Sequence, residues 1–240
     1  MIVSLAAALV AAAISLKAPL EDAAQRFVAL NPGEPVTFTF GGSGQLAQQI
    51  EQGAPVDLFI SASPLDIERL VVARRIELGT CALVAGNRLV VVMPSGSAPL
   101  ADLAGLVSPH FRHVAIGNPK TVPAGRYAQE ALRAANLDTV LAPRFVFAEN
   151  VRQVVEFIAR GDVEAGFVYA TDVALGGAAI TQAFEVEERL HQPIEYEGAV
   201  VAGSASAARA RSFLTFLTST AGRDTFVKHG FLPPRTTAPK

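Results

Sequence analysis

The feature that most constrains the fold of this chain is its regular alternation of strand-like apolar runs with segments of helical periodicity. Short apolar runs, bounded by Gly, Pro or Ser, are repeatedly followed by stretches in which apolar residues recur every three or four positions. Such alternation is typical of a mainly parallel sheet whose crossover connections are helices. The sequence therefore predicts an α/β protein.

The first unit of this pattern covers about 80 residues, a length within the usual range of a small domain. Ser15 follows the first strand and is a favoured N-cap type, so we expect it to cap the first helix, with Pro19 in the first turn. Ser43 follows the second strand at another strand-to-helix junction. Strands are predicted at 9–13, 36–40 and 56–60, and helices at 16–27, 46–52 and 64–75.

The middle of the chain repeats the alternation, and two long strand-like segments flank it. We therefore expect a discontinuous first lobe, formed by residues 1–82 with 198–240, and a second lobe formed by residues 83–197. A chain of 240 residues is long enough for two such lobes. Strands are predicted at 89–93, 114–117, 145–148, 166–169 and 194–202, and helices at 124–135, 151–160, 205–218 and 221–229.

Charge and cysteine content exclude several classes of function. The formal net charge is -2 and the basic residues are scattered, so no basic stripe exists that would bind a nucleic acid. Cys81 is the single cysteine, which excludes an internal disulfide and a cysteine-based zinc site. Its apolar neighbours predict a buried side chain.

The N-terminal segment has two interpretations. Residues 1–14 are apolar and rich in Ala, like the core of an export signal, but no Lys or Arg precedes them. Either a short signal merges into the first strand, or the export signal lies upstream of this Met or has been removed. The apolar run ends by Lys17, short of the roughly 20 residues that a membrane-spanning helix needs.

The junctions between strands and helices are the expected places for a ligand. In parallel α/β sheets ligands bind beyond the carboxyl ends of the strands, where helices begin. The start of a helix offers unpaired backbone N–H groups and the positive end of the helix dipole, so it binds anions without a charged side chain. Five such junctions carry small or hydroxyl residues.

Six separated motifs carry a family resemblance. They are AAISL at 12–16, FGGSGQLA at 40–47, GAPVDLFISA at 53–62, VPAGRYA at 122–128, AENVR at 148–152 and GFVY at 166–169. In this order and spacing they resemble the periplasmic molybdate-binding proteins of bacterial ABC importers. The likeness extends from about residue 10 to residue 231.

The resemblance implies a two-lobed periplasmic-binding-protein fold of type II, with two mainly parallel sheets and a ligand in the cleft between the lobes. It implies an extracytoplasmic, monomeric binding protein that needs no cofactor, captures molybdate or tungstate and delivers it to the membrane permease of an ABC importer. Side-chain O–H and backbone N–H groups would come from the first lobe, and backbone N–H groups and a phenol from the second. The matching positions are Ser15, Ser43, Ala124, Val151 and Tyr169.

The chemistry of these five positions agrees with that implication. All five offer neutral donors and none is acidic, which suits a fully deprotonated dianion. A protonated phosphate would also require a carboxylate acceptor. Sulfate has the charge and shape of molybdate, so its exclusion depends on cavity size.

Three alternatives accompany this hypothesis. Gly41-Gly42-Ser43-Gly44-Gln45 is one residue short of the Gly-x-Ser-x-Gly elbow of serine hydrolases, which also needs a later acid and a histidine such as His191 or His229. A sulfate-class binding protein and an oxyanion sensor domain are the others, and the absence of a DNA-binding segment disfavours the sensor.

His110 and His113 are spaced like metal ligands, but no further ligands lie nearby in the sequence.

Overall fold

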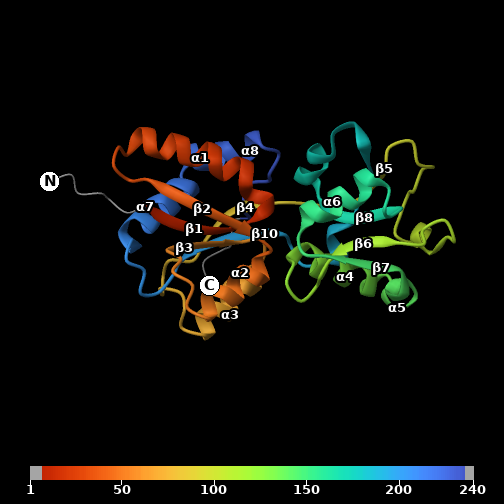
Figure 1. The fold of residues 1–240 in the computed structure, drawn as a ribbon, viewed down its shortest axis with the longest axis horizontal. Coiled ribbons are helices and arrows are strands. Elements are labelled where there is room, and N and C mark those ends of the chain that lie inside the picture. The colour runs from red at the N-terminus through yellow and green to blue at the C-terminus, as the bar shows by residue number, and fades with distance from the viewer. Residues whose placement is uncertain (1–6, 236–240) are drawn as a thin grey trace. The chain divides into compact units, whose positions relative to one another are not determined.

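The computed structural model describes residues 7–235 and divides into two compact units (Figure 1). Unit 1 contains the chain up to Gly86 and from Glu195 onward, and unit 2 runs from Asn87 to Ile194. At both crossings unit 1 is a few residues longer than the boundaries expected at 82 and 198. Residues 1–6, where part of the export-signal hypothesis falls, lie outside the described range.

Unit 1 is built on a five-stranded mixed sheet with the strand order β2-β1-β3-β10-β4. The first three strands along the chain are parallel, and β10 is antiparallel to both of its neighbours. Four of the five strands therefore point the same way. The strands are β1 (Ala8–Ala13), β2 (Val36–Gly41), β3 (Leu58–Ser61), β4 (Ala82–Gly86) and β10 (Glu195–Val200).

Helices cover both faces of this sheet (Figure 1). On one face lie α1 (Lys17–Leu30), α7 (Ala207–Thr218) and α8 (Thr220–Lys228), and on the other α2 (Ser43–Glu51) and α3 (Pro64–Val72). Phe27 packs edge-on against Phe213, with 5.1 Å between the ring centroids. On the second face Ile50 and Leu70 belong to a separate buried cluster. β1 lies inside the sheet between two helical layers, and its small residues Ala11, Ala12 and Ala13 are therefore buried.

Unit 2 repeats the same plan with the strand order β7-β6-β8-β5-β9. Here β6, β7 and β8 are parallel, and β5 is antiparallel to β8 and β9. Figure 1 shows α6 on one side of the sheet and α4 on the other. The elements are β5 (Leu89–Pro94), β6 (Val114–Gly117), α4 (Pro123–Ala134), α5 (Asp138–Leu141), β7 (Phe145–Ala148), α6 (Val151–Arg160), β8 (Ala165–Tyr169) and β9 (Ile180–Glu185).

The structure confirms the predicted α/β class and corrects several local expectations. Ser15 is not an N-cap, because the chain passes through a 3₁₀ turn, Ile14–Leu16, before α1 begins at Lys17. α2 begins at Ser43, three residues earlier than the sequence predicted. Cys81 is exposed, so the prediction of a buried thiol was wrong. Among residues 7–235, no helix combines the length and apolarity that a membrane crossing requires.

Candidate functional site

Ser43 occupies the first position of α2, two residues after β2 ends at Gly41. Its side chain is 1% exposed, and its Oγ accepts a hydrogen bond of 3.1 Å from the backbone N–H of Ala62. A backbone N–H can only donate, so the hydroxyl proton of Ser43 remains available to another acceptor. The N–H groups of Ser43 and Gly44 precede the first helical bond, which Leu46 N–H donates to Gly42 C=O.

A buried network fixes the loop that carries Ala62. Ser61 Oγ donates to Asp66 Oδ2 at 2.9 Å and accepts from Ser63 N–H at 3.0 Å. Ser61, Ser63 and Asp66 are all buried. Sequence reasoning missed this network, and the only signal for it was the dense hydroxyl run at residues 61–63 next to a predicted helix start.

Ser15 lies in the 3₁₀ turn that directly follows β1 and is half-buried. Its Oγ lies 3.1 Å from the phenolic oxygen of Tyr196 on β10. Ala13 and Gly41, the last residues of β1 and β2, are paired in register, and Ser15 and Ser43 each follow two residues later. The structure thus places both serines at the carboxyl ends of two adjacent parallel strands.

Ala124 lies in the first turn of α4, close beyond the end of β6, and is fully buried. The approach of this helix to the strand depends on glycine. A Cβ atom on Gly125 would lie 1.8 Å from the carbonyl oxygen of Gly117, and one on Gly117 would lie 2.4 Å from Val122 Cγ1. The two glycines therefore allow the start of α4 to contact the end of the strand.

Val151 is the first residue of α6, and the loop before it is fixed by reciprocal hydrogen bonds. Asn150 is the N-cap and its Oδ1 accepts from Gln153 N–H at 3.1 Å, while Gln153 Oε1 accepts from Glu149 N–H at 2.7 Å. Such reciprocal capping satisfies backbone donors at the start of a helix. Val151 itself is buried at the first helical position, where the backbone N–H has no partner within the helix.

Tyr169 ends β8 and is 1% exposed. Its backbone N–H donates to Asp172 Oδ2 at 3.3 Å. Burial raises the pKa of the Asp172 carboxyl to about 7, while this hydrogen bond and the charge of Arg152 act in the opposite direction. Asp172 was missed by sequence reasoning, because nothing in its neighbourhood marks it as buried.

The three unit 2 positions share one edge of their sheet. Gly117 at the end of β6 is paired in register with Ala148 at the end of β7, and β8 runs parallel to β6 on its other side. Ala124, Val151 and Tyr169 therefore follow or end three neighbouring parallel strands at their carboxyl ends. This is the edge at which α/β sheets bind ligands.

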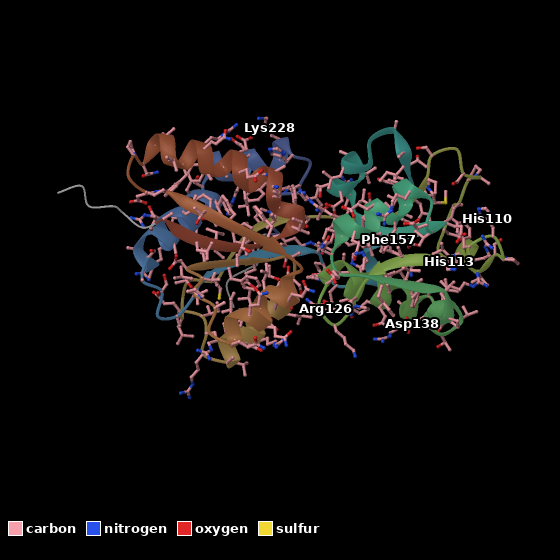
Figure 2. The ribbon with its side chains drawn as sticks, viewed as in Figure 1. His110, His113, Arg126, Asp138, Phe157 and Lys228 are labelled. Carbon is pink, nitrogen blue, oxygen red and sulfur yellow. The ribbon has the colours of Figure 1, made fainter. Side chains whose placement is uncertain are left out.

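The alternative chemistries find no support in the described residues. The histidines have other partners: His229 Nε2 lies 3.2 Å from Asp22, and His191 Nδ1 lies 2.7 Å from the carbonyl oxygen of Gln192. His110 and His113 (Figure 2) lie on the loop leading into β6, at the amino-terminal end of that strand, whereas Ala124 follows its carboxyl end. Across residues 7–235, no group of three His, Cys, Asp or Glu side chains is placed to hold a metal ion.

Comparisons with known proteins agree on one family. The family model described as bacterial extracellular solute-binding protein matches residues 8–232. The molybdate-binding protein ModA of Escherichia coli K12 is 34% identical over 228 residues, covering 92% of this chain and 86% of that protein. A putative ABC transporter substrate-binding lipoprotein of Bacillus subtilis, YvgL, is 31% identical, covering 92% of this chain and 85% of its own length.

The fold is also that of a solved structure. The periplasmic molybdate-binding protein of Azotobacter vinelandii superimposes with a TM-score of 0.84 at 24% identity, covering 95% of this chain and all of that one. At that identity the likeness shows the fold alone. Together with the family match over residues 8–232, it means that this chain belongs to the bacterial extracellular solute-binding protein family.

Proposed function

We propose that this protein is the substrate-binding component of an ABC importer and that it captures molybdate or tungstate. The names of its relatives in Escherichia coli and Bacillus subtilis support the ligand class and the transport role. The membrane permease of that importer would be its partner, and its place would be outside the cytoplasmic membrane. We further propose that it acts as a monomer.

The observation that carries the proposal is the state of Ser43. Its Oγ accepts the N–H of Ala62, a group that cannot accept in return, so this contact leaves the hydroxyl proton of Ser43 available as a donor at the start of α2. A helix start with a hydroxyl donor stabilises an anion through hydrogen bonds and through the helix dipole. A ligand without protons fits such a donor better than one that must also donate.

We propose that the residues that donate to the anion are Ser15 and Ser43 of unit 1 and Ala124, Val151 and Tyr169 of unit 2. The support is that each set lies at the carboxyl ends of parallel strands in its own sheet, with two helix starts in unit 2 and one in unit 1. None of these residues is acidic. A fully deprotonated tetrahedral dianion is the ligand class that this donor set favours.

A thermal-shift series tests the proposal. A ligand that binds only the folded state raises the melting temperature in proportion to the logarithm of its concentration above Kd. We expect molybdate and tungstate to raise the melting temperature in this way and phosphate to do so only at much higher concentrations. A larger shift with sulfate than with molybdate would assign the protein to sulfate instead, and no shift with any of these anions would overturn the proposal.

Removal of one hydroxyl sharpens the test. Ser43→Ala should weaken molybdate binding by roughly 10- to 100-fold, because a hydrogen bond to a charged group contributes about 1.5 to 3 kcal/mol. Ser204→Ala is the matched control. Ser204 bonds Asp57, which directly precedes β3 at the amino-terminal end of that strand, so the substitution should leave affinity unchanged. Equal affinities of the wild type and Ser43→Ala by calorimetry would contradict the assignment of Ser43.

A further inference from the structure

Tyr196 is a fully buried residue of β10 whose hydroxyl lies within hydrogen-bonding distance of Ser15. Its phenolic oxygen lies 3.1 Å from Ser15 Oγ. Its ring packs edge-on against Phe231 at 5.4 Å between centroids, and Phe231 in turn packs against Phe226. These aromatic rings pack on the face of the unit 1 sheet that α8 covers, and this packing holds the phenol in place.

The direction of the hydrogen bond between the two hydroxyls decides what Ser15 can offer to a ligand. A serine hydroxyl has one proton and two acceptor lone pairs. If Ser15 donated to Tyr196, its proton would be used inside the protein and only lone pairs would face an anion. If Tyr196 donates, the proton of Ser15 stays available. A phenol is more acidic than an alcohol and is therefore the better donor.

Ser43 provides an independent precedent in the same unit. Its Oγ accepts from Ala62 N–H, a group that cannot accept, so there the direction is fixed. Both serines at the ends of β1 and β2 thus have a buried group of unit 1 within hydrogen-bonding distance of Oγ. The common consequence would be two hydroxyls that act as donors.

We propose that Tyr196 is a positioning residue for oxyanion binding, whose phenolic O–H donates to Ser15 Oγ and so directs the Ser15 proton to the bound anion. The role rests on the proposed function and is exerted through Ser15, without contact between Tyr196 and the ligand. It also bears on specificity. Because one lone pair of Ser15 is engaged by the phenol, Ser15 is a poorer acceptor for the proton of hydrogen phosphate.

A double-mutant cycle measured by calorimetry with molybdate tests this role. Tyr196→Phe keeps the ring and removes the hydroxyl, and we expect it to weaken binding roughly 3- to 10-fold. Ser15→Ala should weaken binding roughly 10- to 100-fold. The double variant should lie within about twofold of Ser15→Ala, since residues that act through one another are not additive.

Thr225→Val is the matched control for the loss of a buried hydroxyl. Thr225 is fully buried in α8, and its Oγ1 donates to the carbonyl oxygen of Ala221. This variant should lower the melting temperature of the free protein as Tyr196→Phe does, with molybdate affinity unchanged. An equal loss of affinity in Thr225→Val and Tyr196→Phe would assign the effect to general destabilisation and overturn the positioning role.

Phosphate gives a readout that a purely structural role would not move. At mildly alkaline pH phosphate is mainly a protonated dianion, so the ratio of phosphate to molybdate affinity should rise in Tyr196→Phe and stay constant in Thr225→Val. Additive losses in the cycle, or an unchanged ratio, would overturn the role of Tyr196 alone. A wild-type protein that binds neither molybdate nor tungstate would overturn the proposed function itself.

Discussion

At the residue scale, Asp172 is the most deeply buried carboxyl group among residues 7–235. It is 1% exposed, and the one hydrogen bond described for its carboxyl comes from Tyr169 N–H at 3.3 Å. Burial without full compensation disfavours the charged form, which is why the pKa of Asp172 rises to about 7. The carboxyl therefore changes its charge near neutral pH, three residues after a proposed ligand of the anion.

This shift predicts a pH-dependent stability difference between the wild type and Asp172→Asn. The ordinary pKa of the carboxyl is 3.8 and the folded-state pKa is about 7, so the folded state binds the proton more tightly than the unfolded state. The stability linked to Asp172 is thus complete below about pH 4 and is lost as the pH rises through about 7. Asparagine cannot ionise and avoids that loss.

We expect urea unfolding without ligand to show Asp172→Asn gaining stability relative to the wild type from about pH 4 to about pH 8. The upper limit of the gain is about 4 kcal/mol, which corresponds to the difference between the ordinary pKa of 3.8 and the folded-state pKa of about 7. Glu197→Gln is a second test of the same effect, in unit 1. There burial, together with the charges of Glu68 and Glu195, also raises the pKa of Glu197 to about 7. A stability difference for Asp172→Asn that stays constant with pH would contradict this account of Asp172.

Sequence reasoning could find the candidate residues but not their partners. Ser43 was identifiable because Gly-Gly-Ser-Gly follows an apolar run and precedes helical periodicity, and the structure places it at such a junction. Its partner Ala62 is 19 residues away, and Tyr196 is 181 residues from Ser15. Contacts of that separation depend on strand order, which local pattern does not encode. The N-cap expected at Ser15 failed for a local reason, since a 3₁₀ turn intervenes.

At the scale of elements, the start of α4 depends on close contact with the end of β6. An added Cβ at Gly125 would lie 1.8 Å from Gly117 O, a backbone atom that cannot rotate away as a side chain can. Gly125→Ala should therefore push the helix start outward, together with the Ala124 N–H. We expect a loss of about 2 kcal/mol or more in the free energy of unfolding, measured by urea denaturation.

Gly41→Ala is the matched control for this substitution. There an added Cβ would meet Leu46 Cγ at 3.5 Å, which is ordinary van der Waals contact. Its cost should stay below about 1 kcal/mol. If the two substitutions lower the free energy of unfolding equally, the close approach of Gly125 to Gly117 is not what limits the position of α4.

Elements were predictable where their pattern was strong, and were missed where it was weak. The bounds of β6, β7 and α6 agree with the prediction, because apolar runs or a clear helical face mark them. β4 and β9 were missed. Both are edge strands, and three of the six residues of β9 (Ile180–Glu185) are exposed and polar, so neither forms a long buried run. The reversed direction of β5 and β10 follows from chain crossings that the sequence pattern does not show.

At the scale of the whole molecule, the two units share one connectivity. In each sheet the antiparallel strand, β10 or β5, enters directly after the chain crosses from the other unit. The remaining plan is the same, with three parallel strands in each sheet, and the proposed donors lie at the carboxyl ends of two of them in unit 1 and of all three in unit 2. Each unit therefore presents its proposed donors at the carboxyl-end edge of its own sheet.

The proposed function predicts one anion per chain, and stoichiometry tests that prediction. Calorimetry with molybdate should give a single binding event with one anion per chain. Ser43→Ala in unit 1 and Tyr169→Phe in unit 2 should each weaken that same event, by roughly 10- to 100-fold and roughly 3- to 100-fold respectively. Thr225→Val should leave both the stoichiometry and the affinity unchanged. Two separable events, each sensitive to substitution in one unit only, would contradict one anion per chain and would overturn the proposed set of donors.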